Sequence, residues 1–163
     1  MDRIVVSVAA SAILSCLAIP RAEAQTAQDL VGTWTLVSTV TEQGGAKVDT
    51  LGPNPIGTLI FGTDGRYALL FLRRDLPKVA SNNRASQTAE ESKANAQGTI
   101  GHFGTYAVNA ADKSLILRIE GSTFANWIGA EQRRPFSLSG DELTYTSPGS
   151  TGTPAKVVMR RVK

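Results

Sequence analysis

The stretch Leu30-Val-Gly-Thr-Trp-Thr-Leu-Val-Ser-Thr-Val-Thr41 carries the clearest structural pattern in the chain. It is rich in β-branched residues, and Gly32, Trp34, Leu36 and Val40 alternate on one face, which is typical of a strand with one buried side. Trp34 stands near the start of this strand beside a glycine, where another segment can approach closely. We therefore expect Trp34 to close one end of a barrel rather than to contact a ligand.

Similar strand-like segments recur through the rest of the chain and are separated by turn signals such as Thr63-Asp64-Gly65 and Gly140-Asp141. After the first strand, the pattern predicts strands over 58–61, 66–73, 99–108, 114–120, 132–138, 142–147 and 155–162. The capping-box pattern Thr88-Ala-Glu-Glu91 predicts a short helix over about 88–97. The fold class is therefore all-β, a single antiparallel up-and-down barrel of about eight strands with one short helix.

The predicted strand 66–73 has apolar residues on both of its faces. Leu70 and Leu72 point away from the face that would line the barrel, so another element is expected to cover them. The polar, alanine-rich connection 75–98, which contains the predicted helix, is the nearest candidate. We expect this connection to be mobile.

Composition excludes several classes of protein. The chain has 163 residues, 42% of them hydrophobic and 19% charged, which suits one folded domain with a core of its own. The net charge of +3 is spread along the chain rather than gathered into a basic stripe, and only 6% of residues are aromatic. A nucleic-acid partner is therefore not expected.

Residues 1–24 have the pattern of a secretory signal peptide. Arg3 provides a short basic start, residues 4–19 are apolar, Pro20 breaks the run, and Ala22-Glu23-Ala24 is a small-x-small cleavage pattern. We expect export to the periplasm or the extracellular space, with 25–163 as the mature barrel domain and no transmembrane segment within it.

A second interpretation of the same segment rests on its cysteine. Ala12-Ile13-Leu14-Ser15-Cys16 also fits a lipobox, which would make Cys16 a lipidated membrane anchor. Cys16 is the only cysteine in the sequence. The mature domain therefore has no thiol for catalysis, and with a single histidine no metal site or cofactor is predicted.

Several short motifs together resemble a known family. The Gly32-x-Trp34 entry strand is similar to that of the lipocalins and the wider calycin group. The more specific motifs are Asn54-Pro55-Ile-Gly57, Thr63-Asp64-Gly65-Arg-Tyr67, Gly104-Thr-Tyr106, Asn126-Trp127-x-Gly129-x-Glu131-Gln132-x-Arg134 and Phe136-x-Leu138-x-Gly140-Asp141-x-Leu143. In this combination the chain resembles the bacterial and fungal lipocalin-like domain family from Leu30 to about Arg161.

The resemblance implies a calycin-type barrel with a central cavity for a small, mostly apolar ligand. It also implies that a basic residue near the last strand packs over the entry tryptophan. Arg160 and Arg161 are both placed to do so for Trp34.

His102 is the only histidine and shares a strand face with Gly104 and Tyr106. If that face lines the cavity, His102 is the natural general acid or base, with Tyr106 as a proton donor. The alternative is a histidine held by hydrogen bonds at the barrel mouth, and we favour it because no partner residue stands at a fixed spacing. Gly104 is expected to mark a bend or a close approach in the sheet.

The stretch Ser122–Arg134 combines large aromatic residues, amides and charges, as a ligand site does. If it is extended, Phe124 and Asn126 share one side and Trp127 points to the other. Arg133 and Arg134 are successive, so one of them points inward. That arginine would bind a ligand carboxylate or form an internal salt bridge to Glu131 or Glu120.

The leading hypothesis is a binding protein, not an enzyme, for a small hydrophobic or amphipathic molecule held in the barrel. The predicted ligand-binding residues are Tyr67, Phe71, His102, Tyr106, Phe124, Asn126, Trp127, Arg133 (or Arg134) and Tyr145. One alternative is a barrel-cavity isomerase or cyclase that uses His102 and Tyr106 as acid and base. The other is a non-catalytic envelope interaction or inhibitor protein that makes contact through 75–98. The sequence specifies no oligomeric state.

Overall fold

The computed structural model describes residues 25–163. The predicted signal peptide and the predicted lipidation site at Cys16 lie outside the described residues. Strands dominate the fold, and the prediction of an all-β class is confirmed. Within 25–163 no helix has the length and apolar character needed to cross a membrane.

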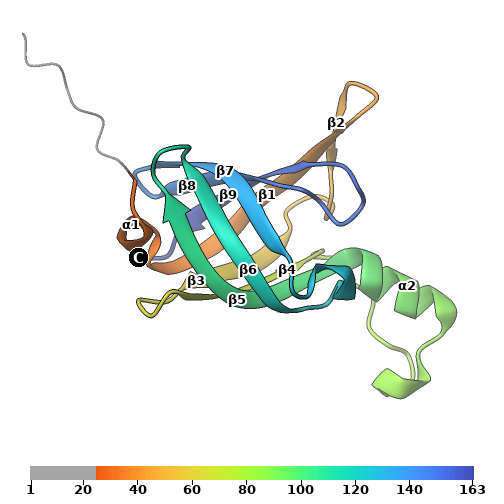
Figure 1. Ribbon diagram of the computed structural model, residues 1–163. Helices are drawn as coiled ribbons and strands as arrows, with labels where there is room; N and C mark the ends of the chain where they lie inside the picture. The colour runs from red at the N-terminus through yellow and green to blue at the C-terminus, as the bar shows by residue number, and fades with distance from the viewer. Residues whose placement is uncertain (1–24) are drawn as a thin grey trace, which may run out of the picture.

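Eight strands close into one antiparallel barrel, and a ninth short strand extends from it (Figure 1). The barrel strands are β1 (Gly32–Gln43), β3 (Ile56–Phe61), β4 (Arg66–Leu72), β5 (Thr99–Asn109), β6 (Ser114–Ser122), β7 (Glu131–Ser139), β8 (Glu142–Ser147) and β9 (Ala155–Arg161). Each strand from β3 to β9 pairs with the next, β1 pairs with β3, and pairing of β1 with β9 closes the barrel. The extra strand β2 (Ala46–Asp49) forms a hairpin with the end of β1 across Gly44-Gly45, where both glycines have positive φ.

Strand β1 changes its inward face along its length. Trp34 and Leu36 point inward, as the alternation predicts, but a bulge between Leu36 and Ser38 shifts the register against β9. Beyond the bulge, Thr39 and Thr41 are buried and Val40 is only half-buried. The expectation that Val40 shares the face of Trp34 was therefore wrong, because one extra residue reverses the alternation.

One end of the barrel is closed by the N-terminal segment. The one-turn helix α1 (Ala27–Leu30) lies there, and the C-terminus lies beside it (Figure 1). The indole nitrogen of Trp34 donates to the carbonyl oxygen of Leu30 at 2.9 Å, and both residues are fully buried. The Arg161 guanidinium lies 4.1 Å from the centre of the Trp34 ring. Of the two arginines left open by the sequence, Arg161 is thus the one over the tryptophan.

The second helix, α2 (Ala89–Gly98), projects from the opposite end of the barrel (Figure 1). It begins where the sequence predicts, with Thr88 as N-cap and Glu91 completing the capping box. Leu70 remains 44% exposed, however, so the expectation that this connection covers the outer face of β4 was wrong. The polar helix has no apolar face to bury there, and it borders the barrel mouth instead.

Strand β5 needs a glycine where it passes β6. The register slips between Phe103 and Gly104, and a Cβ atom at position 104 would collide with the carbonyl oxygen of Arg118. Gly104 therefore marks a close backbone approach at a bulge, as the sequence indicates. The bulge directly follows His102 in the chain.

Candidate ligand-binding cavity

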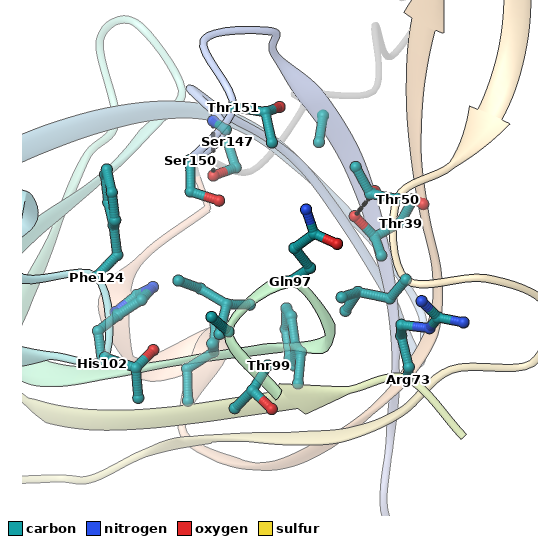
Figure 2. Close-up of a pocket in the computed structure, with 18 of the residues that line it drawn as sticks. Thr39, Thr50, Arg73, Gln97, Thr99, His102, Phe124, Ser147, Ser150 and Thr151 are labelled. Carbon is teal, nitrogen blue, oxygen red and sulfur yellow. Dashed lines mark hydrogen bonds between the residues drawn. The ribbon is translucent and has the colours of Figure 1, made fainter. Parts of the chain in front are cut away.

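The open end of the barrel leads into a cavity of about 1140 Å³. Its walls come from β1, β4, β5, β7, β8 and β9, and its mouth from α2 and the loops that follow β2, β6 and β8. Figure 2 shows His102 and Phe124 on one side of this space, and Thr39, Thr50 and Arg73 on the other. This volume includes the open mouth, and it is large enough to hold a small molecule.

The depth of the cavity follows from which residues of each strand reach it. Leu69 on β4, His102 on β5, Arg134 on β7, Tyr145 on β8 and Val157 on β9 line it. The next inward residues toward α1 do not line it, and they form the packed half of the barrel: Tyr67, Gly104, Phe136, Leu143 and Met159. Leu69, His102, Arg134, Tyr145 and Val157 therefore form the cavity floor.

Five of the predicted ligand-binding residues line the cavity: Phe71, His102, Phe124, Trp127 and Tyr145. Tyr67 and Tyr106 point into the barrel but lie below the cavity floor, and their predicted placement in the cavity is corrected on that ground. Tyr106 packs against Phe61 with ring centres 4.6 Å apart and donates its hydroxyl to the carbonyl oxygen of Gly62. Inward direction alone did not distinguish the open half of the barrel from the filled half.

The stretch Ser122–Arg134 is not extended at its centre. Residues Ala125–Trp127 form a single 3₁₀ turn, labelled η2, in which the amide of Trp127 donates to the carbonyl oxygen of Phe124. Residues three apart eclipse each other in such a turn, so Phe124 and Trp127 both reach the cavity. Asn126 is exposed and does not line the cavity, which corrects its predicted role as a polar anchor.

The two successive arginines separate as strand alternation requires. Arg133 points outward, where it pairs with Asp112 at 3.4 Å and approaches Glu131 at 4.0 Å. Its predicted place in the cavity is therefore wrong, and Arg134, the alternative, lies inside with 1% of its surface exposed. Glu120 pairs with Arg66 instead, at 2.6 Å.

His102 is held by hydrogen bonds from two directions. Its Nδ1 lies 2.8 Å from the Tyr67 hydroxyl, and its Nε2 lies 3.3 Å from the Arg134 guanidinium. Burial, together with the charge of Arg134, lowers the pKa of His102 to about 3. The imidazole is therefore neutral at physiological pH, and it is a weak general base.

The predicted acid and base pair is not formed. His102 contacts Tyr67 and not Tyr106, and Tyr106 lies below the cavity floor with its hydroxyl committed to Gly62. Tyr106 follows His102 by four residues on β5, which places it too far toward the plugged end of the barrel to line the cavity. This pair therefore offers no support for the isomerase or cyclase alternative.

A row of rings runs from the core to the mouth of the cavity. Tyr67, His102, Trp127 and Phe124 follow one another edge to face, with ring centres 5.4, 5.7 and 5.6 Å apart. Such contacts add to the free energy gained from burial and fix the ring directions. They give the cavity a firm aromatic wall on the side of η2.

Sequence reasoning missed most of the mouth. Polar residues gather there, and Figure 2 shows Ser147, Ser150 and Thr151 opposite Thr99, with Gln97 of α2 between them. Ser150 and Thr151 lie in a loop, Gln97 lies at the end of a helix, and Thr99 and Ser147 are the end residues of strands, where periodicity is a weak guide to side-chain direction. The one available signal was the length of the 75–98 connection, because long ordered loops beside a barrel often border a site.

The fold and the cavity define a class: an antiparallel barrel of eight strands that is plugged at one end by its N-terminal segment and is hollow at the other. Residues 31–156 match the family model described as a lipocalin-like domain, which spans most of the chain. The protein belongs to this lipocalin-like family. No curated protein gave a significant match.

Proposed function

We propose that this protein binds a small hydrophobic or amphipathic molecule in the cavity at the open end of the barrel. The observation that carries the proposal is the cavity itself, about 1140 Å³ in a barrel that is otherwise tightly filled. Its lining combines apolar area from Leu69, Phe71, Ile100 and Val157 with many polar side chains around the mouth. This is the composition of sites that bind small molecules by burial and orient them by hydrogen bonds.

The expected driving force is removal of apolar surface from water, about 25 cal/mol for each Å² buried, less the cost of ordering the ligand. Because the cavity wall is already formed by rigid strands and edge-to-face rings, little protein ordering has to accompany binding. Aromatic and aliphatic ligands are both compatible with this wall.

The test is a screen of fatty acids, isoprenoids and aromatic metabolites by thermal shift and native mass spectrometry. A ligand with one-to-one stoichiometry is expected to raise the melting temperature. Trp127→Ala should weaken its binding by about tenfold or more, since a cavity wall is removed. Phe103→Ala is the matched control, because Phe103 is half exposed on the outside of the barrel.

Two results would reject the proposal. One is the absence of stabilisation by any member of the screen. The other is equal loss of binding in Trp127→Ala and Phe103→Ala, which would place the ligand on the outer surface. Loss in Trp127→Ala alone supports the proposal.

The interaction or inhibitor alternative gains no support from the connection 75–98. Among the described residues, the large apolar side chains that are exposed all lie outside 75–98. A helix bordering the mouth of a cavity fits control of ligand entry better than attachment to a partner protein.

We also propose export, on the pattern of residues 1–24. Cell fractionation with mass spectrometry of the mature N-terminus tests it. An N-terminus at Gln25 supports soluble export, an acylated Cys16 supports the lipoprotein alternative, and an intact Met1 in the cytoplasmic fraction contradicts both.

A further inference from the structure

Arg134 is a buried cation without an anion. Only 1% of its surface is exposed, and no ion pair links it to a carboxylate among residues 25–163. Its partners are neutral: Gln132 Oε1, at 2.6 and 3.2 Å, and His102 Nε2. A guanidinium stays protonated in proteins, so a full positive charge is kept at the cavity floor at a substantial desolvation cost.

The hydrogen bonds around Arg134 leave donors in excess. A guanidinium only donates, so His102 Nε2 accepts, and the histidine proton must therefore sit on Nδ1 and point to the Tyr67 oxygen. The Tyr67 hydroxyl hydrogen then remains free. The hydroxyl of Tyr145 is buried, which raises its pKa, and lies near the Arg134 guanidinium, which acts to lower that pKa, but it makes no hydrogen bond of good geometry among the described residues.

Acceptors are correspondingly scarce. Gln132 Oε1 and His102 Nε2 are already used, and the ring of Tyr145 lies 5.3 Å from the Arg134 guanidinium carbon. Burial raises the pKa of Tyr145 to about 12, so this phenol is neutral and supplies no negative charge at physiological pH. A buried cluster with one positive charge and unused donors is complementary to an oxyanion.

The cluster borders the cavity rather than the outside of the barrel, with 1 to 4% of each of its side chains exposed. Arg134, Tyr145 and His102 are all part of the cavity floor, below the apolar walls. At the mouth Arg73 is paired with Asp75 at 3.0 Å, and Arg84 stands against the single lining acid Asp49, so the charge that favours an anion is that of Arg134 at the floor.

We propose that Arg134 and Tyr145 form a carboxylate-binding subsite at the cavity floor, and that the ligand is a small amphipathic carboxylic acid inserted head first. The planar carboxylate matches the fork of the guanidinium, and the Tyr145 hydroxyl supplies a further donor. The apolar tail lies against Phe71, Ile100 and Phe124 and extends toward the polar mouth. This inference rests on the proposed function and names the chemical class of its ligand.

The test compares three probes of equal chain length by titration calorimetry: dodecanoate and dodecyltrimethylammonium below their micelle concentrations, and dodecan-1-ol below its solubility limit. The wild-type protein is expected to bind dodecanoate at least tenfold more tightly than the alcohol, and the cation most weakly. Arg134→Met should abolish this preference but should still bind dodecan-1-ol. The matched control is Arg133→Met, which removes the neighbouring arginine on the outer face and should leave the preference unchanged.

Melting temperatures show whether Arg134→Met folds, and we expect it to be at least as stable as the wild type because it removes an unpaired buried charge. Arg134→Lys keeps the charge but loses the fork, so part of the preference should remain. Equal binding of dodecanoate and dodecanol by the wild type, or an unchanged preference in Arg134→Met, overturns the inference and leaves the proposed function standing. Binding of only neutral members of the wider screen has the same consequence, whereas no binding by any probe or screened molecule overturns both.

Discussion

Arg161 connects the two ends of the chain at the plugged end of the barrel. Its guanidinium covers the Trp34 ring and donates to the carbonyl oxygens of Val31 and Asp29 at 2.8 and 2.6 Å. It thereby satisfies backbone acceptors that the short α1 turn leaves open. Arg160, one residue earlier, points outward and is exposed.

Replacing Arg161 by lysine should therefore destabilise the fold. A lysine cannot reproduce two directed hydrogen bonds together with ring stacking, and the expected loss is about 2 kcal/mol in the free energy of unfolding. Urea denaturation measures it, with Arg160→Lys as the control that should change little. Similar losses in both variants would contradict the role assigned to Arg161.

His102 gives the protein a defined sensitivity to acid. Its pKa falls from the ordinary 6.5 to about 3 in the fold, so between these values the unfolded chain binds a proton that the folded chain does not. Stability should therefore decrease as the pH falls from 6.5 toward 3. The decrease is expected to be about 2 kcal/mol by pH 4.5.

The measurement is the free energy of unfolding at pH 6.5 and 4.5 for the wild type and for His102→Gln. Glutamine can still accept from Arg134 and donate to Tyr67, but it does not titrate. His102 is the only histidine, so the variant should lose most of the slope in this window. Parallel curves for the two proteins would show that His102 is not the cause.

For single residues, the sequence predicts whether a side chain points into or out of the barrel, but not how far along the barrel axis it lies. Alternation established that only one of Arg133 and Arg134 points inward, and Arg134 shares its parity with the apolar Phe136 and Leu138, a local signal that the prediction of Arg133 did not use. Tyr67 and Tyr106 were correctly placed inside the barrel, but the boundary between filled and hollow halves is set by packing of distant strands. That boundary cannot be read from one strand at a time.

Strand β5 can pair with β6 as it does only because residue 104 is a glycine. At Gly104 the bulge brings the backbone of β6 so close that a methyl group would meet the Arg118 carbonyl. At Gly101, on the same strand, the nearest atom to an added Cβ is the flexible Leu70 side chain at 3.2 Å.

Gly104→Ala should therefore cost about 2 to 3 kcal/mol or more, and Gly101→Ala clearly less. Thermal and urea unfolding of the two variants provide the comparison. If both alanines are tolerated equally well, the bulge does not require the close approach described. The sequence signalled this glycine because it interrupts a strand pattern, which is a local property.

The sequence predicted which residues form helix α2, but not where the helix lies against the barrel. Its capping box is encoded within four residues, whereas its place at the mouth depends on how the long connection from β4 to β5 folds back. Ala96 on this helix borders the cavity, and Lys93 is exposed and does not. The helix thus offers a matched pair of positions.

Ala96→Trp is expected to narrow the mouth and to weaken ligand binding by about tenfold, equivalent to about 1.4 kcal/mol, with little change in melting temperature. Lys93→Trp adds the same ring away from the cavity and should leave affinity unchanged. Titration calorimetry with the tightest-binding ligand of the screen measures the affinity of both variants. An equal effect of both substitutions would mean that α2 does not border the binding route.

For the whole molecule, the architecture was the most predictable part. Regular alternation, turn signals and several family motifs converged on an eight-stranded barrel because each is a local consequence of the same closed sheet. The extra strand β2 and the bulge in β1 were not predicted, since both arise from pairing between distant segments. The hollow half of the barrel likewise results from global packing.

The proposed ligand lies inside this hollow half with its charged head at the floor. Isotope-filtered nuclear Overhauser spectroscopy with ¹³C-labelled dodecanoate tests this placement most directly. We predict contacts from the C2 protons to Tyr145 and Trp127, and from the chain methyl to Ala96 at the mouth. Contacts to the exposed outer residues Ile60, Leu70 and Phe103, without any to Tyr145 or Trp127, would contradict this placement.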